Sequence, residues 1–334
     1  MPHAENVSVR NAPTSLDASA GRFECAACGD RAYDIFLSDV PDRLGVTSKT
    51  FTYVRCRGCE LIALFPRPTF AETASFYPSS FWRTKTEPAA RVSLPQRVET
   101  WLRSRLIKAD FALVEDLFRP GLHMLDVGCS TGDFLDLCRT RGIVPHGIEL
   151  SPAAAEHCRS RGLDVTAGDL VTHDFGDQKF DVVTYNGVLE HITEPAAHLR
   201  KCRKLLSPGG KLVVLGLPNI ESAGFKLARR SWMGLDAPRH IHQFSQASVA
   251  RLLARTGYVV SRIEPRSPRF NPPSLIASVL PALHRHKFDA HQAQTGKNPV
   301  GRKAILLALL ELSRPADWAL CQLGLSENLT VVAE

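Results

Sequence analysis

The sequence predicts a doubly wound α/β fold, a mostly parallel seven-stranded sheet with helices on both faces, preceded by a small N-terminal module. Strand-like apolar runs alternate with helix-like segments from Leu122 onward, which is typical of parallel strands joined by crossover helices. The first of these strands runs directly into a turn framed by Gly128 and Gly132. Two Cys-x-x-Cys pairs, at 25–28 and 56–59, stand ahead of this region and indicate a module with its own chemistry.

The composition is that of an ordinary globular protein. The chain has 334 residues, 44% of them hydrophobic and 22% charged, enough for one main domain with an appendage. Its formal charge of +7 permits acidic partners such as nucleic acid, phosphorylated sugars or anionic lipid, and equally fits a basic surface kept for solubility. Because we find neither a signal-peptide core nor an apolar run of membrane-spanning length, we interpret the protein as cytoplasmic, with its nine cysteines as thiols or metal ligands.

The chain divides into three predicted parts. Residues 1–21 are polar and without periodicity, and we expect them to be a disordered tail. Residues 22–82 form the cysteine module, and residues 96–334 form the main domain. Leucines at helical spacing predict a helix over Val98–Phe118 that leads into this domain, and a helical insertion at about 270–325 precedes the last strand.

Seven apolar runs supply the predicted strands of the main domain. They are Leu122–Val127, Val144–Leu150, Leu163–Ala167, Phe180–Tyr185, Lys211–Leu217, Tyr258–Ile263 and Asn328–Ala333. Helix starts are indicated between them by Ser151-Pro152, which offers an N-cap and a first-turn proline, and by Ser245. Ser207–Gly210 is expected to break the helix ahead of the fifth strand.

Acidic residues stand at the ends of the first three strands. Ligands of such a sheet bind at the carboxyl ends of its strands, where Asp126, Glu149 and Asp169 converge. The turn carries Ser130 in place of the middle glycine that lets a dinucleotide approach, so the acids favour a cationic ligand over a pyrophosphate. In S-adenosylmethionine, Glu149 would accept from the ribose diol, Asp169 from the adenine amine, and Asp126 would face the amino-acid end.

Five motifs occur in a fixed order. They are Leu125–Gly132, Glu149, Gly168-Asp169, Phe180–Ile192 and Ser207–Gly210. In this order and spacing the chain resembles the class I S-adenosylmethionine-dependent methyltransferases, over about Val98 to Ile263 and again in the last strand. The resemblance implies a Rossmann-like fold, methyl transfer, and cofactor contacts by Asp126, Gly128, Cys129, Gly132, Glu149, Leu150, Gly168, Asp169, Leu170, Asn186 and Gly187.

Two histidines are the candidate catalytic bases. His240 is the first choice, because its run Pro238–Ser245, with Trp232 upstream, resembles one found in many bacterial members of the family. His191 follows the fourth strand, near the expected methyl position, and the alternative is a histidine packed under the next helix. Arg239 would bind an acidic group of the substrate or simply be solvated.

The cysteine pairs predict a structural zinc site made of Cys25, Cys28, Cys56 and Cys59. Four thiolates suit tetrahedral Zn²⁺ and leave no open position for water. A redox pair is the alternative, which the presence of two pairs disfavours. Glu60 stands where such ribbons usually have glycine. The module resembles the zinc ribbon attached to some bacterial sugar and polyketide methyltransferases.

The predicted function is methyl transfer to an oxygen or carbon atom of a small molecule, a sugar or a lipid-linked glycan. One alternative is RNA base methylation with substrate recognition by the zinc ribbon. It is disfavoured because Tyr185–Val188 lacks the Asn/Asp-Pro-Pro-aromatic motif and the ribbon lacks a stacking platform. A second alternative, a non-catalytic cofactor-binding scaffold, is disfavoured by the retained acids.

Two apolar segments in the insertion suggest a further contact. Ser274–Leu280 and Ala304–Leu310 are too short to span a bilayer. Basic residues flank them, namely His284, Arg285, His286, Lys287, Arg302, Lys303 and Arg314. This pattern is compatible with peripheral contact through 274–314 with the inner membrane face, near a lipid-linked substrate. The alternative is a hairpin packed over the sheet edge or against a second subunit, which leaves an oligomer open.

Overall fold

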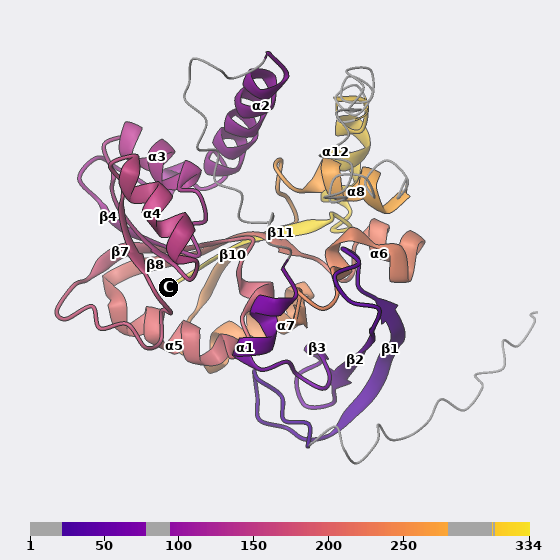
Figure 1. Cartoon of the computed structure of the whole chain (residues 1–334). Coiled ribbons are helices and arrows are strands. Elements are labelled where there is room, and N and C mark those ends of the chain that lie inside the picture. The colour runs from indigo at the N-terminus through magenta and orange to yellow at the C-terminus, as the bar shows by residue number, and fades with distance from the viewer. Residues whose placement is uncertain (1–21, 78–93, 280–308, 310) are drawn as a thin grey trace, which may run out of the picture.

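The structure, a computed structural model, describes residues 22–77, 94–279, 309 and 311–334 (Figure 1). Within these ranges the chain forms a seven-stranded sheet and a four-stranded sheet. The larger sheet belongs to the main domain and carries the predicted cofactor edge. The smaller one contains most of the cysteine module.

The seven-stranded sheet has the order β10-β11-β8-β7-β4-β5-β6. Its strands are β4 (His123–Val127), β5 (Val144–Glu149), β6 (Asp164–Ala167), β7 (Phe180–Asn186), β8 (Leu206–Pro218), β10 (Val260–Glu264) and β11 (Asn328–Ala333). The neighbours from β8 to β6 are parallel, whereas β11 runs antiparallel to both β8 and β10. The predicted mostly parallel seven-stranded α/β fold is confirmed.

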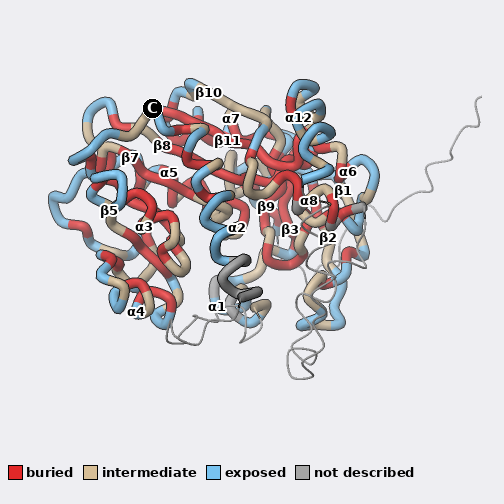
Figure 2. The backbone as a smooth tube through the Cα atoms, turned by 90° about the horizontal axis from the view of Figure 1, so that it is seen from above, coloured by how far each residue is buried: buried red, intermediate tan, exposed pale blue. Residues whose placement is uncertain are grey.

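Helices cover both faces of this sheet (Figure 1). They are α2 (Leu94–Phe111), α3 (Asp133–Thr140), α4 (Pro152–Ser160), α5 (Pro195–Leu205) and α7 (Gln246–Arg255). A further helix, α6 (Ala223–Ala228), packs Phe225 in the core of the smaller sheet. Successive residues of a strand point to opposite faces, so Leu125 packs in the core shared with α5 and α7 while Met124 packs in the core shared with α2 and α3. Both cores bury the middle strands along most of their length (Figure 2).

Predicted helix starts are confirmed by their caps. The Ser151 hydroxyl accepts from the Ala154 N–H, and Ser245 forms a capping box with Ser248. Two predicted boundaries are wrong. Helix α2 ends at Phe111, because the chain turns back through a 3₁₀ turn and packs the Phe118 ring 5.0 Å from that of Phe111.

The second wrong boundary concerns Ser207–Gly210. These residues do not separate a helix from a strand but lie inside β8, which begins at Leu206. Leu206 pairs with Phe180, and the register then shifts before Lys211 pairs with Val182. The glycines therefore accommodate an irregularity in the strand rather than a loop.

The four-stranded sheet is antiparallel and has the order β1-β2-β3-β9. Its strands are β1 (Tyr33–Pro41), β2 (Thr50–Cys56), β3 (Ile62–Leu64) and β9 (His242–Gln243), and the short helix α1 (Phe70–Ser75) follows β3. Strand β9 comes from the main domain, so the predicted division into 22–82 and 96–334 runs through a hydrogen-bonded sheet. The cysteines Cys25, Cys56 and Cys59 also join the apolar core that contains α5 and α7 residues.

The insertion between β10 and β11 contains helices α8 (Asn271–Val279) and α12 (Arg314–Gln322), which lie beside each other near α6 (Figure 1). Most of the predicted membrane-contact segment, including its basic residues from 284 to 303, lies outside the described residues. Among the helices that are described, none has the length and apolar character needed to cross a bilayer.

Candidate active site

The glycine-framed turn between β4 and α3 is held in a left-handed conformation. Gly128, Ser130 and Gly132 have φ values of 72°, 51° and 77°. A Cβ atom added at Gly128 would lie 2.8 Å from the Val188 side chain, and one at Gly132 would lie 2.5 Å from Leu163. Side chains are thus excluded at both ends of the turn for steric reasons, whereas Ser130 fits between them.

Glu149 joins this turn to the next helix. Its Oε2 accepts from the Ser130 N–H at 2.9 Å, and its Oε1 accepts from the Ser151 N–H at 2.8 Å. Each oxygen keeps a further lone pair, so the carboxylate can still accept from a diol. Burial raises its pKa, and these two backbone donors oppose the shift.

The other two predicted acids lie on the same edge of the sheet. Asp126 ends β4, is buried, and its Oδ1 accepts from the Thr184 hydroxyl at 2.6 Å. Burial raises the pKa of Asp126 to about 7. Asp169 follows β6, and its Oδ2 lies 3.4 Å from Nε2 of His198, which lowers its pKa. The side chain of Leu150 remains 49% exposed beside Glu149 and offers an apolar surface to a planar ring.

The remaining predicted cofactor residues differ in whether their side chains or only their backbone groups could reach a ligand. The side chains of Cys129 and Leu170 are buried, so they offer backbone groups only. Gly168, with a φ of 154°, follows β6, and its N–H donates to the Glu149 carbonyl. Asn186 ends β7, and Gly187 follows it. All of these positions border the same edge of the sheet, and their roles stay predictions.

Arg269 and Phe270 reach this edge from the insertion and were missed in the sequence. The guanidinium of Arg269 donates to Oδ1 of Asn186 at 3.2 Å. The Phe270 ring would lie 3.3 Å from a Cβ placed on Gly187 and 2.3 Å from one on Gly216. No local pattern marks these residues, because the segment that carries them contacts β7 and β8 only through the tertiary fold.

The two candidate bases meet in space. The rings of His191 and His240 are 4.5 Å apart and nearly perpendicular, although 49 positions separate them in the sequence. Glu190 completes the group, with its Oε1 3.9 Å from Nε2 of His191 and 4.0 Å from Nε2 of His240. Glu190, His191 and His240 are called the histidine cluster below. Sequence reasoning missed Glu190, although its place beside His191 after β7 was a usable signal.

Burial controls the charges in the histidine cluster. It raises the pKa of Glu190 to about 8 and lowers the pKa of His191 to about 3. The pKa of His240 is lowered for the same reason, with Asp236 opposing the shift. Both imidazoles are therefore neutral at physiological pH and can accept a proton from a bound acceptor.

The cysteine module helps to hold this cluster. The hydroxyl of Tyr53, on β2, lies 2.7 Å from the His240 carbonyl and 2.9 Å from that of Leu235. The Ile241 N–H donates to the Glu190 carbonyl, and the next residue, His242, pairs with Ala63 of β3. The loop that carries His240 is thus fixed between the module and the end of β7.

One expectation about this loop is wrong. Arg239 neither binds a substrate acid nor is solvated, because its buried guanidinium pairs with Asp42 at 2.9 Å and with Asp236 at 2.8 Å. Sequence periodicity could not show this pairing, since Asp42 is distant in the chain. His242 precedes the helix as expected but is buried in β9, away from the exposed side of the cluster.

The four predicted zinc ligands also come together. Sγ of Cys25 lies 3.5 Å from Sγ of Cys59, Cys28 and Cys56 are equally close, and the four ligand atoms all lie within 4.8 Å of one another. Zn–S bonds of about 2.3 Å would place neighbouring sulfurs about 3.8 Å apart, so the donor set fits a tetrahedral ion. Gly29 and Glu60 close the two turns with φ values of 75° and 62°, so a glutamate here adopts the conformation that glycine favours.

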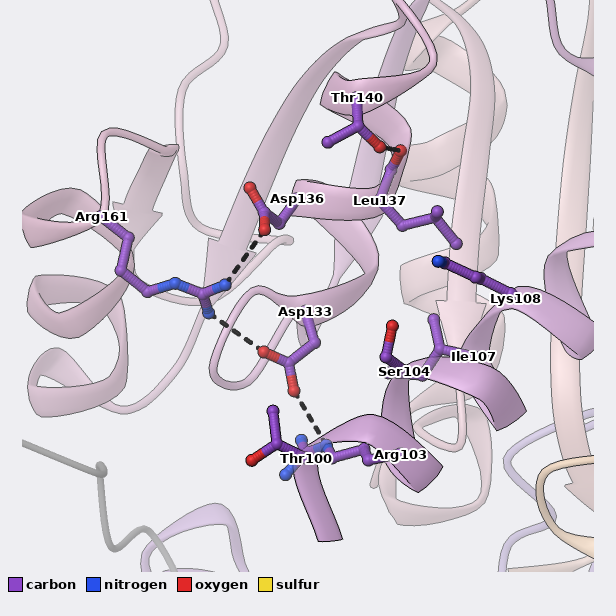
Figure 3. A pocket seen from close by; sticks show the side chains of 10 residues that line it. All are labelled: Thr100, Arg103, Ser104, Ile107, Lys108, Asp133, Asp136, Leu137, Thr140 and Arg161. Atoms are coloured by element: carbon purple, nitrogen blue, oxygen red, sulfur yellow. Dashed lines mark hydrogen bonds and ion pairs between the residues drawn. The ribbon is translucent and has the colours of Figure 1, made fainter. Parts of the chain in front are cut away.

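A pocket of about 300 Å³ lies behind the glycine-framed turn, between α2 and α3 (Figure 3). Two arginines from different helices, Arg103 and Arg161, both pair with Asp133, at 2.8 Å and 3.0 Å. Arg103 also donates to the Thr131 hydroxyl. Because these charges neutralise one another, we interpret them as a support for the turn.

Comparison with protein families assigns the region that contains the glycine-framed turn. Residues 99–262 match the family described as a methyltransferase domain. Two similar curated proteins are both named ubiquinone biosynthesis O-methyltransferase. The one from Cereibacter sphaeroides is 30% identical over 133 residues, which cover 38% of this chain and 54% of that protein. The one from Caulobacter is 35% identical over 106 residues, 29% of this chain and 41% of that protein. This chain spans about half the length of the curated relatives it matches.

Solved structures with similar folds carry related names. Magnesium protoporphyrin IX methyltransferase from Synechocystis, with bound SAH, is 19% identical, with a TM-score of 0.43 over 58% of this chain and 90% of that chain. CalS10, an amino pentose methyltransferase from Micromonospora echinaspora, is 32% identical, with a TM-score of 0.31 over 36% of this chain and 55% of that chain.

Proposed function

We propose, because residues 99–262 match the methyltransferase-domain family, that this chain is an S-adenosylmethionine-dependent methyltransferase acting on an oxygen or carbon atom of a small molecule. The observation that carries the proposal is one edge of the sheet. The acids that end or follow β4, β5 and β6 border it, and the histidine cluster lies just beyond the end of β7. A cationic nucleoside bound at this edge would lie next to a proton acceptor.

The cofactor would be held by residues from three strand ends. Glu149 has free lone pairs for the two ribose hydroxyls, and Asp169 for the adenine amine. The exposed side chain of Leu150 lies next to Glu149 and would cover one face of the adenine. Asp126 and the glycine-framed turn would face the ammonium of the methionine part. When bound, the cofactor supplies an electrophilic methyl group on a sulfonium.

The chain's own contribution to the reaction is positioning and proton acceptance. His240 and His191 are neutral and present nitrogen lone pairs just beyond the Asn186-Gly187 turn. Either could accept the proton of an acceptor hydroxyl, and His240 is the more firmly held of the two. Phe270 lies over Gly187 and Gly216 and would contact an apolar part of the acceptor.

The cysteine cluster would hold one structural Zn²⁺. Four thiolates leave the ion without an open position, so its role is to fix the module. The module in turn supports the His240 loop through Tyr53 and β3. Zinc would therefore act on catalysis only through the position of that loop.

Direct binding tests the proposal. We expect S-adenosylmethionine and S-adenosylhomocysteine to bind one per chain in titration calorimetry, and Glu149→Gln to weaken both. The matched control is Glu156→Gln, an exposed helix residue that pairs with Arg159. Transfer of a labelled methyl group to a panel of phenols, sugars and hydroxy acids then identifies the acceptor class. A folded protein that binds neither nucleoside would overturn the proposal.

A further inference from the structure

The histidine cluster has an arrangement that proton acceptance alone does not explain. Three side chains from two segments direct their acceptor atoms toward one another, and all three atoms lie within 4.8 Å of each other. Glu190 and His191 follow β7, whereas His240 comes from the loop fixed by the cysteine module. A functional base needs one such atom, not three.

The tautomers of both histidines are set by backbone carbonyls. Nδ1 of His191 lies 3.0 Å from the Arg239 carbonyl and 3.2 Å from the Tyr77 hydroxyl, which can accept beside the carbonyl, and Nδ1 of His240 lies 2.7 Å from the Gly234 carbonyl. Because a carbonyl oxygen only accepts, each Nδ1 carries the hydrogen. Each neutral ring therefore has a lone pair on Nε2, the atom that faces Glu190.

The Glu190 carboxylate meets no donor from these rings. Oε2 of Glu190 is buried and has no hydrogen-bond partner among the described residues, and Oε1 faces the two Nε2 lone pairs. Burying a carboxylate without a donor is costly, so Glu190 keeps its proton in the empty site, and a cation among the three acceptor atoms would stabilise the ionised form. Bonds of about 2.0–2.2 Å to an ion set neighbouring ligand atoms about 3.0–3.5 Å apart, so Glu190 needs to approach each histidine by about 1 Å or less.

We propose that Glu190, His191 and His240 bind a divalent transition-metal cation. The two Nδ1–H···O=C bonds are the outer contacts by which proteins usually orient metal-bound imidazoles. The site is open on one side, since 26% of the His191 side chain and 13% of the His240 side chain are exposed. A Cβ on Gly187 would lie 3.9 Å from Oε1 of Glu190, so the ion would lie beside the cofactor edge.

This assignment gives the ion a role that rests on the proposed function. An acceptor hydroxyl that ligates the open side of the ion would have a lowered pKa. With both Nε2 lone pairs bound to the ion, the acceptor's O–H proton would pass to solvent water and the electron pair would remain on the oxygen. That oxygen would attack the methyl group as the carbon–sulfur bond breaks with its electron pair on sulfur. An acceptor with two adjacent oxygens would occupy two open positions and bind best.

The cysteine cluster must be kept apart from this site in any test. Nitrogen and carboxylate ligands accept Mn²⁺, whereas four thiolates select softer ions. We would therefore titrate the zinc-loaded protein with Mn²⁺ and follow binding by electron paramagnetic resonance. We expect one Mn²⁺ per chain, with nitrogen couplings from two imidazoles in the spin-echo spectrum.

Matched variants locate the ion. Glu190→Gln keeps the shape of the side chain, and His240→Gln removes one ligand; we expect each to weaken Mn²⁺ binding at least tenfold. The control is His123→Gln, at the exposed start of β4, which should bind as the wild type does. Wild-type protein that binds no Mn²⁺, or binds it without nitrogen coupling, would overturn the site even if a variant failed to fold. Unchanged affinity in Glu190→Gln would also overturn the site.

Cofactor binding is measured separately without Mn²⁺, so failure of the proposed function and failure of the metal site give different results.

Discussion

The glycine-framed turn and the histidine cluster lie on the same edge of the sheet but are built in different ways. The turn and its acids come from one continuous stretch, Leu125 to Asp169, in which each strand end is followed by its own helix. The histidine cluster joins the end of β7 to a loop whose position depends on β2 and β3 of the cysteine module. Cofactor binding should therefore tolerate damage to the module, whereas turnover should not.

The largest effect is expected from loss of the zinc site, which lies away from the histidine cluster but supports the loop that carries His240. Cys56→Ser should abolish zinc binding, since a structural site contributes about 10 kcal/mol or more of binding energy in small zinc domains. We expect the module to loosen and turnover to fall to background, while calorimetry still detects cofactor binding. Elemental analysis checks the metal, and Cys138→Ser, outside the cluster, is the control. Zinc retained in Cys56→Ser would show that the four cysteines are not the site.

Removal of the first candidate base comes next. His240→Ala should lower turnover about 10²–10⁴-fold, because general-base catalysis contributes about that much. Cofactor affinity should stay within about twofold, since the side chain lies beyond the acids that hold the cofactor. His191→Ala should lower turnover less, and His123→Ala should have no effect. Steady-state kinetics at saturating cofactor measures the difference, and wild-type turnover in His240→Ala would move the base elsewhere.

Substitutions at the glycine-framed turn and its acids should reduce cofactor affinity first, unlike those at the histidine cluster. Glu149→Ala should weaken S-adenosylmethionine binding about ten- to a hundredfold, because a charge-assisted hydrogen bond is worth about 1.5–3 kcal/mol. The same substitution frees the N–H groups of Ser130 and Ser151, so part of the loss comes from a looser turn. Glu149→Gln, which keeps one acceptor oxygen, should bind with intermediate affinity. Equal calorimetric affinities for all three proteins would refute the assignment.

The pH dependence of cofactor binding tests whether the ionised carboxylate of Asp126 favours the cationic cofactor. Burial raises its pKa to about 7, so below that pH the folded protein carries a neutral acid beside the cationic cofactor. Affinity should therefore rise as pH increases from 6 to 8, by up to about tenfold, and then level off. Asp126→Asn should bind weakly and without this dependence. A wild-type affinity that falls over the same range would contradict the charge assigned here.

The smallest effect is expected at the second knuckle. Glu60 has a φ of 62°, a conformation that costs a residue with a side chain about 1 kcal/mol relative to glycine. Glu60→Gly should therefore raise the stability of the zinc-loaded protein slightly, although it removes the ion pair with exposed Arg251. Denaturant unfolding measures the change, and Glu24→Gly is a comparison outside the left-handed positions. A loss above about 1 kcal/mol would show that the ion pair matters more than the backbone.

Local chemistry explains what could be predicted from the sequence. The caps at Ser151 and Ser245, the left-handed glycines and the acids at strand ends each depend on residues close in the chain. Strand β1 was missed because its pairing with β2 shifts register twice, which interrupts the alternation that marks a strand. Arg269, Arg239 and Tyr53 were missed or misassigned because their partners lie far away in sequence. The features that could be predicted have partners close in the sequence, whereas the residues that were missed or misassigned have partners far away in it.

Strand β9 gives the cysteine module a property that a simple appendage lacks. Its two residues, His242 and Gln243, join the main-domain chain to the four-stranded sheet, and they follow His240 after a single residue, Ile241. The module therefore cannot be replaced by the equivalent module of another protein without affecting the main domain. A chimaera that carries the ribbon of a related protein would need to bring a matching edge strand with it, and a mismatch there would displace His240 while leaving the nucleoside edge intact. Ribbon and histidine loop are thus expected to vary together between relatives with different acceptors.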